Sequence, residues 1–295
     1  MLGREIYVQR REVLKKKLGK GVVILPGNNE SPRNYKDNCY SFDQDSTFLY
    51  YFGMDIPSLV GVIDIDNDKE YIFGTDFTLD DIVWMGEQKL LKSYAEEAGV
   101  ENFIEMSEFE KFAAQLKADK REVLLIPQYR ADNVMKLSKA LGLDPFKYDE
   151  HTSLDLIKAI IEQRNVKSQV EIDELEKAVN ITKEMHLTAM KTVKAGMKEY
   201  EVVAAIEAVA KKYYGSTSFF TIFTKNGHIL HNHGYDNTVE DGDMIVLDCG
   251  AKSREGYCGD MTTAFPVNGK YSDKQKDMYS LLIEMFEKAE EMVRP

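Results

Sequence analysis

The first half of the chain alternates short apolar runs with amphipathic segments. We expect strands where apolar residues follow one another between turn residues, and helices where they recur every three or four positions. The expected strands are residues 21–26, 48–52, 59–65, 70–73 and 122–126, and the expected helices are 4–18, 79–85, 93–98, 109–116 and 131–141. This alternation predicts an α/β domain over residues 1–148.

The pattern changes after residues 142–149, where a proline and polar residues interrupt the periodicity. Ser168 and Glu171 form a capping box at the start of a long helix that Gly196 ends. A second helix over 200–214 is followed by expected strands at 219–223, 229–230, 245–247 and 261–265, and by a last helix from about Ser272. We assign residues 149–295 to a second domain.

An aspartate borders each of two of these apolar strand segments: Asp248 directly follows 245–247, and Asp260 directly precedes 261–265. A buried carboxylate is costly unless a positive group meets it. A hairpin turn centred on Arg254 would place the two aspartates directly opposite each other, where like charges destabilise a sheet. We therefore interpret the pair as a site for one or two hard divalent cations, such as manganese or magnesium. The alternative is that either aspartate is a strand-end cap or a solvated edge residue.

Three histidines, His228, His231 and His233, come shortly before this hairpin. On a strand, the spacing of two would put His231 and His233 on one face. Such a cluster is often only structural, but its position beside a candidate metal hairpin makes a functional role an equal alternative. We interpret His151 and His186 as structural or solvated. The sequence has no HExxH, GxSxG, GxGxxG or phosphate-binding loop motif.

The composition restricts the class of protein further. A net charge of −12 argues against nucleic-acid or anionic-membrane partners, which select basic surfaces. The 43% hydrophobic and 30% charged residues are typical of a globular protein, and no apolar run is long enough to cross a membrane. The three cysteines form no CxxC pair, which favours a reduced, cytoplasmic chain.

Three stretches of the sequence resemble one known family. The hairpin segments DCGA (248–251), GDMT (259–262) and FPVNGK (265–270) resemble the metal hairpin of the aminopeptidase P and prolidase group, the pita-bread metallopeptidases. Residues 42–53 (FDQDSTFLYYFG) are similar to the signature of the aminopeptidase P N-terminal domain, and residues 164–172 (RNVKSQVEI) to the entry of the catalytic domain. Asp43 and Thr263 depart from the family, which usually has arginine at both positions.

The resemblance implies a fold and a metal site. It implies a creatinase/aminopeptidase P-type α/β domain followed by an incomplete pita-bread catalytic domain. In the family, the residue matching Asp248 binds one metal and the residue matching Asp260 bridges two, while the histidine matching His231 steadies the tetrahedral intermediate. The implied cofactor is two divalent ions, foremost manganese, with cobalt and zinc as alternatives. The remaining ligands, one histidine and two glutamates, are expected downstream of Pro295.

The activity implied is that of an Xaa-Pro aminopeptidase, which removes the N-terminal residue from peptides with proline at the second position. A prolidase that cleaves Xaa-Pro dipeptides and a metal-free binding or scaffold module are the alternatives. We expect peptide substrates, no nucleic-acid or membrane partner, a homodimer or homotetramer, and a cytoplasmic location. Because only part of the ligand set is present, we expect the 295-residue chain to be inactive alone.

Overall fold

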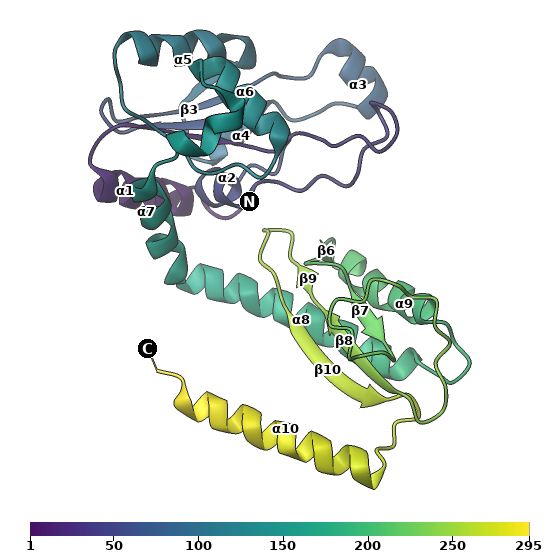
Figure 1. Cartoon of the computed structure of the whole chain (residues 1–295). Helices are drawn as coiled ribbons and strands as arrows, with labels where there is room; N and C mark the ends of the chain where they lie inside the picture. The colour runs from purple at the N-terminus through teal and green to yellow at the C-terminus, as the bar shows by residue number, and fades with distance from the viewer. Residues whose placement is uncertain (295) are drawn as a thin grey trace. The chain divides into compact units, whose positions relative to one another are not determined.

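The structure is a computed structural model that describes residues 1–294. The chain forms two compact units, Met1–Lys167 and Ser168–Pro295 (Figure 1). Each unit has its own buried core.

The first unit contains a five-stranded mixed sheet in the order β4-β3-β2-β1-β5. Its strands are β1 (Val22–Pro26), β2 (Val60–Asp64), β3 (Lys69–Gly74), β4 (Asn102–Glu105) and β5 (Val123–Leu124). Strand β2 runs antiparallel to both of its neighbours, whereas β1 pairs in parallel with β5 and β3 with β4. The carboxyl ends of β1, β3, β4 and β5 therefore meet at one edge of the sheet.

Helices cover both faces of this sheet (Figure 1). On one face lie α1 (Arg4–Leu18), α2 (Ser46–Phe52), α4 (Leu91–Glu97) and α7 (Leu154–Asn165), which pack against Val23 and Leu25. On the other face lie η1 (Met106–Glu108), α5 (Phe109–Ala118), α6 (Ala131–Leu141) and η2 (Pro145–His151), which pack against Val22 and Ile24. Successive residues of β1 thus point into opposite cores, as expected of a strand buried on both faces.

The sequence-based prediction missed the strand β4 and the helix α7 of the first unit, and it was wrong at two further places. Residues 48–52 were predicted to be a strand but belong to the helix α2, whose first turn is capped by Asp45 accepting from the backbone N–H groups of Thr47 and Phe48. A short run that is apolar all round is compatible with either structure, so periodicity could not separate them. The compact units also divide after Lys167 rather than at 148/149, because α7 buries Leu156 and Ile160 in the first core.

Helix α3 (Leu79–Met85) belongs to the first unit but has no buried residue. Trp84, the single tryptophan of the chain, is 86% exposed on it. This helix therefore adds nothing to either core of the sheet.

The second unit begins with the two long helices α8 (Gln169–Thr192) and α9 (Glu199–Lys212). The strands β6 (Ser216–Thr217), β7 (Ile222–Thr224), β8 (Met244–Cys249), β9 (Ala251–Lys252) and β10 (Met261–Pro266) follow, and α10 (Asp273–Met292) is the last helix. Strands β10, β8 and β7 form an antiparallel sheet, and β6 pairs with β9. Helices α8 and α9 pack on one face of the larger sheet, with Phe223, Leu247 and Phe265 in the core.

Most elements of the second unit were predicted, but β6 and β9 were not, and the strand expected at 219–223 begins only at Ile222. Residues 229–230 were expected to be a strand, but they lie in turns between β7 and β8. Ile229 and Leu230 are both exposed there, so their apolar character had suggested a burial that does not occur. Within the described residues 1–294, no helix has the length and apolar character needed to cross a bilayer.

Candidate metal centre

The candidate site lies on the face of the β10-β8-β7 sheet that α8 and α9 leave uncovered. In β8, Ile245, Leu247 and Cys249 point into the helix-packed core, whereas the alternating residue Asp248 is only partly buried. Asp248 is opposite Thr262 in the register of β8 and β10. Asp260, two residues before Thr262, therefore shares the face of Asp248.

The register of the hairpin differs from our prediction by two residues. The turn centres on Glu255 rather than Arg254. It is closed by the Ser253 N–H, which donates to the Tyr257 carbonyl over 2.8 Å. Gly256 takes up a φ of 85° inside this turn, a conformation that glycine adopts at little cost. The expected direct opposition of Asp248 and Asp260 is therefore wrong, and the two are diagonal neighbours on one face.

Both aspartates line a cavity of about 350 Å³. Its other lining residues are Phe219, Phe220, Ile222, His231 and His233. No lysine or arginine is among them, and Oδ1 of Asp248 is buried without a hydrogen-bond partner among the described residues. An acceptor left unpaired at a buried position costs about 1–3 kcal/mol, and more when it is charged. The arrangement therefore favours a bound cation.

The histidines divide as their spacing predicted, although the segment that carries them is not a strand. His231 and His233 both line the cavity, whereas His228 does not. The ring of His233 lies edge-on to Phe220, with 5.4 Å between the ring centroids. The family resemblance implied a role for His231 alone, and the two-residue spacing was the only signal in the sequence that included His233.

Helix α8 holds the hairpin in place through two polar side chains. Oγ1 of Thr182, which is fully buried, accepts a hydrogen bond from the Ala251 N–H over 2.9 Å. Nδ1 of His186 lies 2.9 Å from Oγ1 of Thr263 in β10. Burial lowers the pKa of His186, while backbone groups and the charge of Asp248 act in the opposite direction. Of the two roles that we expected for His186, structural or solvated, its burial and its contact with β10 favour the structural one.

The donor atoms at the site suit a hard divalent ion. Asp248 and Asp260 supply carboxylate oxygens, the ligands that manganese and magnesium prefer. The neighbouring thiol of Cys249 points into the opposite core, and burial raises its pKa to about 12, so it stays protonated at neutral pH. Within residues 1–294, no three histidine, cysteine, aspartate or glutamate side chains are grouped so as to hold a metal. The two aspartates therefore fit as part of a metal site.

Comparison with protein families matches both units. Residues 7–125 match the aminopeptidase P N-terminal domain, and residues 173–295 match metallopeptidase family M24. The two matched segments fall within the two compact units of the structure.

Known proteins resemble the chain along most of its length. It is 30% identical over 273 residues to the human Xaa-Pro dipeptidase, covering 89% of this chain and 54% of that protein. It is 26% identical over 310 residues to the Xaa-Pro aminopeptidase of Escherichia coli K12, covering 100% of this chain and 69% of that protein. The chain thus spans about half the length of the human relative.

Solved structures give the same result for the fold. Zinc-substituted E. coli aminopeptidase P in complex with product superposes with a TM-score of 0.86 at 26% identity, covering 100% of this chain and 69% of the other. The aminopeptidase PepP of Pseudomonas aeruginosa gives a TM-score of 0.84 at 23% identity, covering 96% of this chain and 66% of the other.

Proposed function

Because the chain belongs to the pita-bread metallopeptidases of family M24 and carries the N-terminal domain of aminopeptidase P, we propose that it serves in the metal-dependent removal of the N-terminal residue from peptides with proline at the second position. The observation that supports this most is the meeting of Asp248, Asp260 and His231 in one cavity. The buried Oδ1 of Asp248 has no hydrogen-bond partner among the described residues, which supports the binding of a cation there.

Five of the seven residues that line the cavity have a distinct part in this proposal. Asp248 and Asp260 would hold divalent ions, foremost manganese and two in number. Such ions lower the pKa of water and polarise a carbonyl group. A ring N–H of His231 donates to the oxygen of the scissile carbonyl, where negative charge develops during attack. Phe220 and Ile222 supply an apolar wall against which a proline ring can pack.

We propose that the 295-residue chain alone does not turn over substrate. Two carboxylates replace only a small part of the water shell of two hard ions, and such ions dehydrate reluctantly. A further histidine and two glutamates, supplied by a longer form of the protein, would complete the ligand set.

Prolidase activity is the second candidate, and the 30% identity to the human Xaa-Pro dipeptidase favours it. The two activities differ in the length of peptide that they accept. Hydrolysis of Ala-Pro-Ala would support the aminopeptidase, whereas hydrolysis of Ala-Pro alone would support the prolidase. A metal-free scaffold, the third alternative, would bind no stoichiometric manganese.

The location and assembly of the protein are part of the same proposal. Three cysteines without a disulfide and a net charge of −12 are compatible with a cytoplasmic peptidase. We propose a homo-oligomer, a dimer or a tetramer, which size-exclusion chromatography with light scattering would distinguish from a monomer.

The decisive experiment measures release of alanine from Ala-Pro-Ala with added Mn²⁺. It compares the 295-residue chain with a longer gene product that supplies the remaining ligands. We expect activity only in the longer form, and its loss in Asp248→Asn and Asp260→Asn. Asp273→Asn is the matched control, because the side chain of Asp273 is fully exposed on α10. Equal turnover by both forms would show that these two aspartates suffice, and the ligand set proposed here would be wrong.

A further inference from the structure

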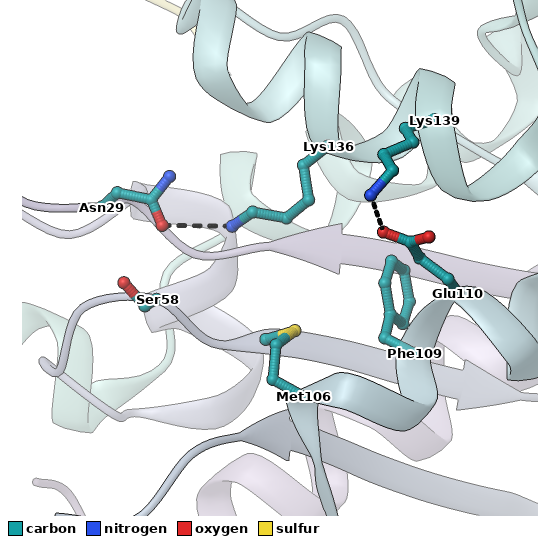
Figure 2. A pocket seen from close by; sticks show the side chains of 7 residues that line it. All are labelled: Asn29, Ser58, Met106, Phe109, Glu110, Lys136 and Lys139. Atoms are coloured by element: carbon teal, nitrogen blue, oxygen red, sulfur yellow. Dashed lines mark hydrogen bonds and ion pairs between the residues drawn. The ribbon is translucent and has the colours of Figure 1, made fainter.

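A second cavity lies in the first unit, at the edge where the carboxyl ends of β1, β3, β4 and β5 meet (Figure 2). It has a volume of about 260 Å³. Asn29 follows β1, Ser58 precedes β2, Met106 follows β4 directly, and Lys136 comes from α6. In open α/β sheets, ligands bind in the crevice outside the carboxyl ends of the strands. The cavity therefore occupies the place where this architecture offers a binding site.

The cavity contains one cation that has no carboxylate partner. Nζ of Lys136 donates to Oδ1 of Asn29 over 3.1 Å, and among residues 1–294 no carboxylate lies within ion-pair distance of it. Lys139, by contrast, is neutralised by Glu110 over 2.6 Å. Figure 2 shows the Lys136 amine directed across the cavity toward Asn29 and the Lys139 amine directed to Glu110. Of the two lysines, only Lys136 is available to an anion.

The side chain of Lys136 is partly buried. Burial lowers the pKa of its amine, and the charge of Asp132 opposes this only in part. Asp132 itself accepts a hydrogen bond from the side-chain amide of Asn29, which turns the Asn29 carbonyl toward Lys136. A partly desolvated ammonium whose only partner is a neutral oxygen gains from an anionic ligand.

The rim and the floor of the cavity supply the other features of a binding site. Ser58, on the rim, has a φ of 64°, the left-handed region that non-glycine residues rarely adopt. Its backbone N–H donates to the Asn28 carbonyl over 2.9 Å, which holds this strained turn. Strained backbone of this kind is concentrated at ligand-binding positions. Met106 and Phe109 form an apolar floor beneath the polar groups.

We propose that this cavity binds a small organic monocarboxylate with an apolar group, its carboxylate on Lys136 and Ser58 and its apolar part on Met106 and Phe109. A phosphate dianion fits less well, because only one cation is available and Glu110 and Asp132 lie nearby. The volume also suits a ligand smaller than an ordinary cofactor. The site lies in the first unit and does not depend on the metal chemistry proposed for the second.

The test is a titration of the whole 295-residue chain into 3-(4-fluorophenyl)propionate, followed by the ¹⁹F NMR line width. We expect saturable broadening for the carboxylate and none for the corresponding amide. Lys136→Gln should weaken binding about tenfold, which corresponds to ~1.4 kcal/mol. Lys111→Gln removes the same charge from α5 at an exposed position and should leave the affinity unchanged.

Because Lys136 is partly buried, two further variants separate loss of binding from loss of folding. Met106→Gln should weaken binding of the carboxylate ligand while leaving Lys136 in place. Ser58→Gly removes the hydroxyl and relieves the left-handed strain, so affinity should fall while the denaturation midpoint stays or rises. Absence of saturable broadening in the unaltered chain would overturn the proposal. Equal affinity for acid and amide, or unchanged affinity in all three variants with native melting curves, would overturn it as well.

Discussion

Asp248 occupies a position that costs stability unless a cation binds beside it. Its Oδ1 is buried without a partner, and Asp260 shares its face of the sheet. Among the described residues, the cavity brings no positive side chain to the pair. Active sites commonly retain such unfavourable groups because the chemistry requires them.

His231 gives the sharpest test of the site at the scale of one residue. In the longer, active form, His231→Ala should lower kcat by about 10²-fold or more, as loss of a donor to developing negative charge typically does. His228→Ala is the matched control, because His228 lies in the same turn region but does not line the cavity. It should change kcat by only a few-fold. Equal losses in the two variants would contradict the assignment.

Arg11 is a buried cation that connects two helices of the first unit. It is 1% exposed, and its guanidinium donates to the carbonyls of Tyr51 and Ala98, at the ends of α2 and α4. Burial lowers its pKa to about 10, so it remains charged at neutral pH. Arg11→Met would leave these carbonyls unsatisfied, and we expect about 3 kcal/mol less stability. Arg4→Met, at an exposed position of the same helix, should stay within about 0.5 kcal/mol in urea denaturation.

The chemistry of individual residues could be predicted because charge inside an apolar strand is visible in the sequence. Asp248 stood out for this reason. Asp260 directly precedes β10 and is exposed, and both aspartates line one cavity. Their surroundings could not be predicted in the same way. Phe219 and Phe220 reach the cavity through the path of a loop, which no short-range pattern determines.

At the scale of elements, the hairpin shows where prediction from the sequence fails. The two strands were located correctly, since each contains a run of apolar or β-branched residues next to turn residues. The register of their pairing was predicted incorrectly. It depends on which residue takes the left-handed conformation in the turn, and here that residue is Gly256. A shift of two residues keeps both aspartates on the same face of the sheet, so the prediction that they share a face did not depend on the exact pairing. The strand predicted at 48–52 failed for another reason: full burial removes the periodicity that identifies a helix.

The packing of the hairpin against α8 gives a prediction at this scale. A Cβ added at Gly259 would lie 2.3 Å from Oγ1 of Thr182 and 2.9 Å from the Ala178 carbonyl. Because the Ala178 backbone cannot move away easily, Gly259→Ala should cost about 2 kcal/mol. Thermal denaturation measures the loss. Gly234→Ala, where the nearest atom would be 3.5 Å away, is the control and should change little. A native midpoint for Gly259→Ala would show that the close packing of hairpin and helix is not required.

At the scale of the whole molecule, the chain consists of two units that each complete their own core. The first is held by a sheet covered on both faces, and the second by a sheet covered on one face by α8 and α9. Stabilisation by a bound ligand should therefore be confined to the unit that holds the ligand. This makes it possible to test the two proposed sites separately in one chain.

Manganese should protect only the second unit. If Asp248 and Asp260 bind Mn²⁺ weakly, a concentration ten times the Kd adds about 1.4 kcal/mol to the stability of the state that binds it. Hydrogen–deuterium exchange with mass spectrometry should then show slower exchange in peptides from β8 and β10 and no change in residues 1–167. Asp248→Asn should abolish this protection.

Without metal, the same substitution should raise stability by up to about 1 kcal/mol, because it removes the repulsion between two like charges. Asp273→Asn should respond to Mn²⁺ as the unaltered chain does, since its side chain is fully exposed outside the cavity. Protection that persists in Asp248→Asn would show that the cation binds elsewhere and that the unpaired carboxylate serves another purpose.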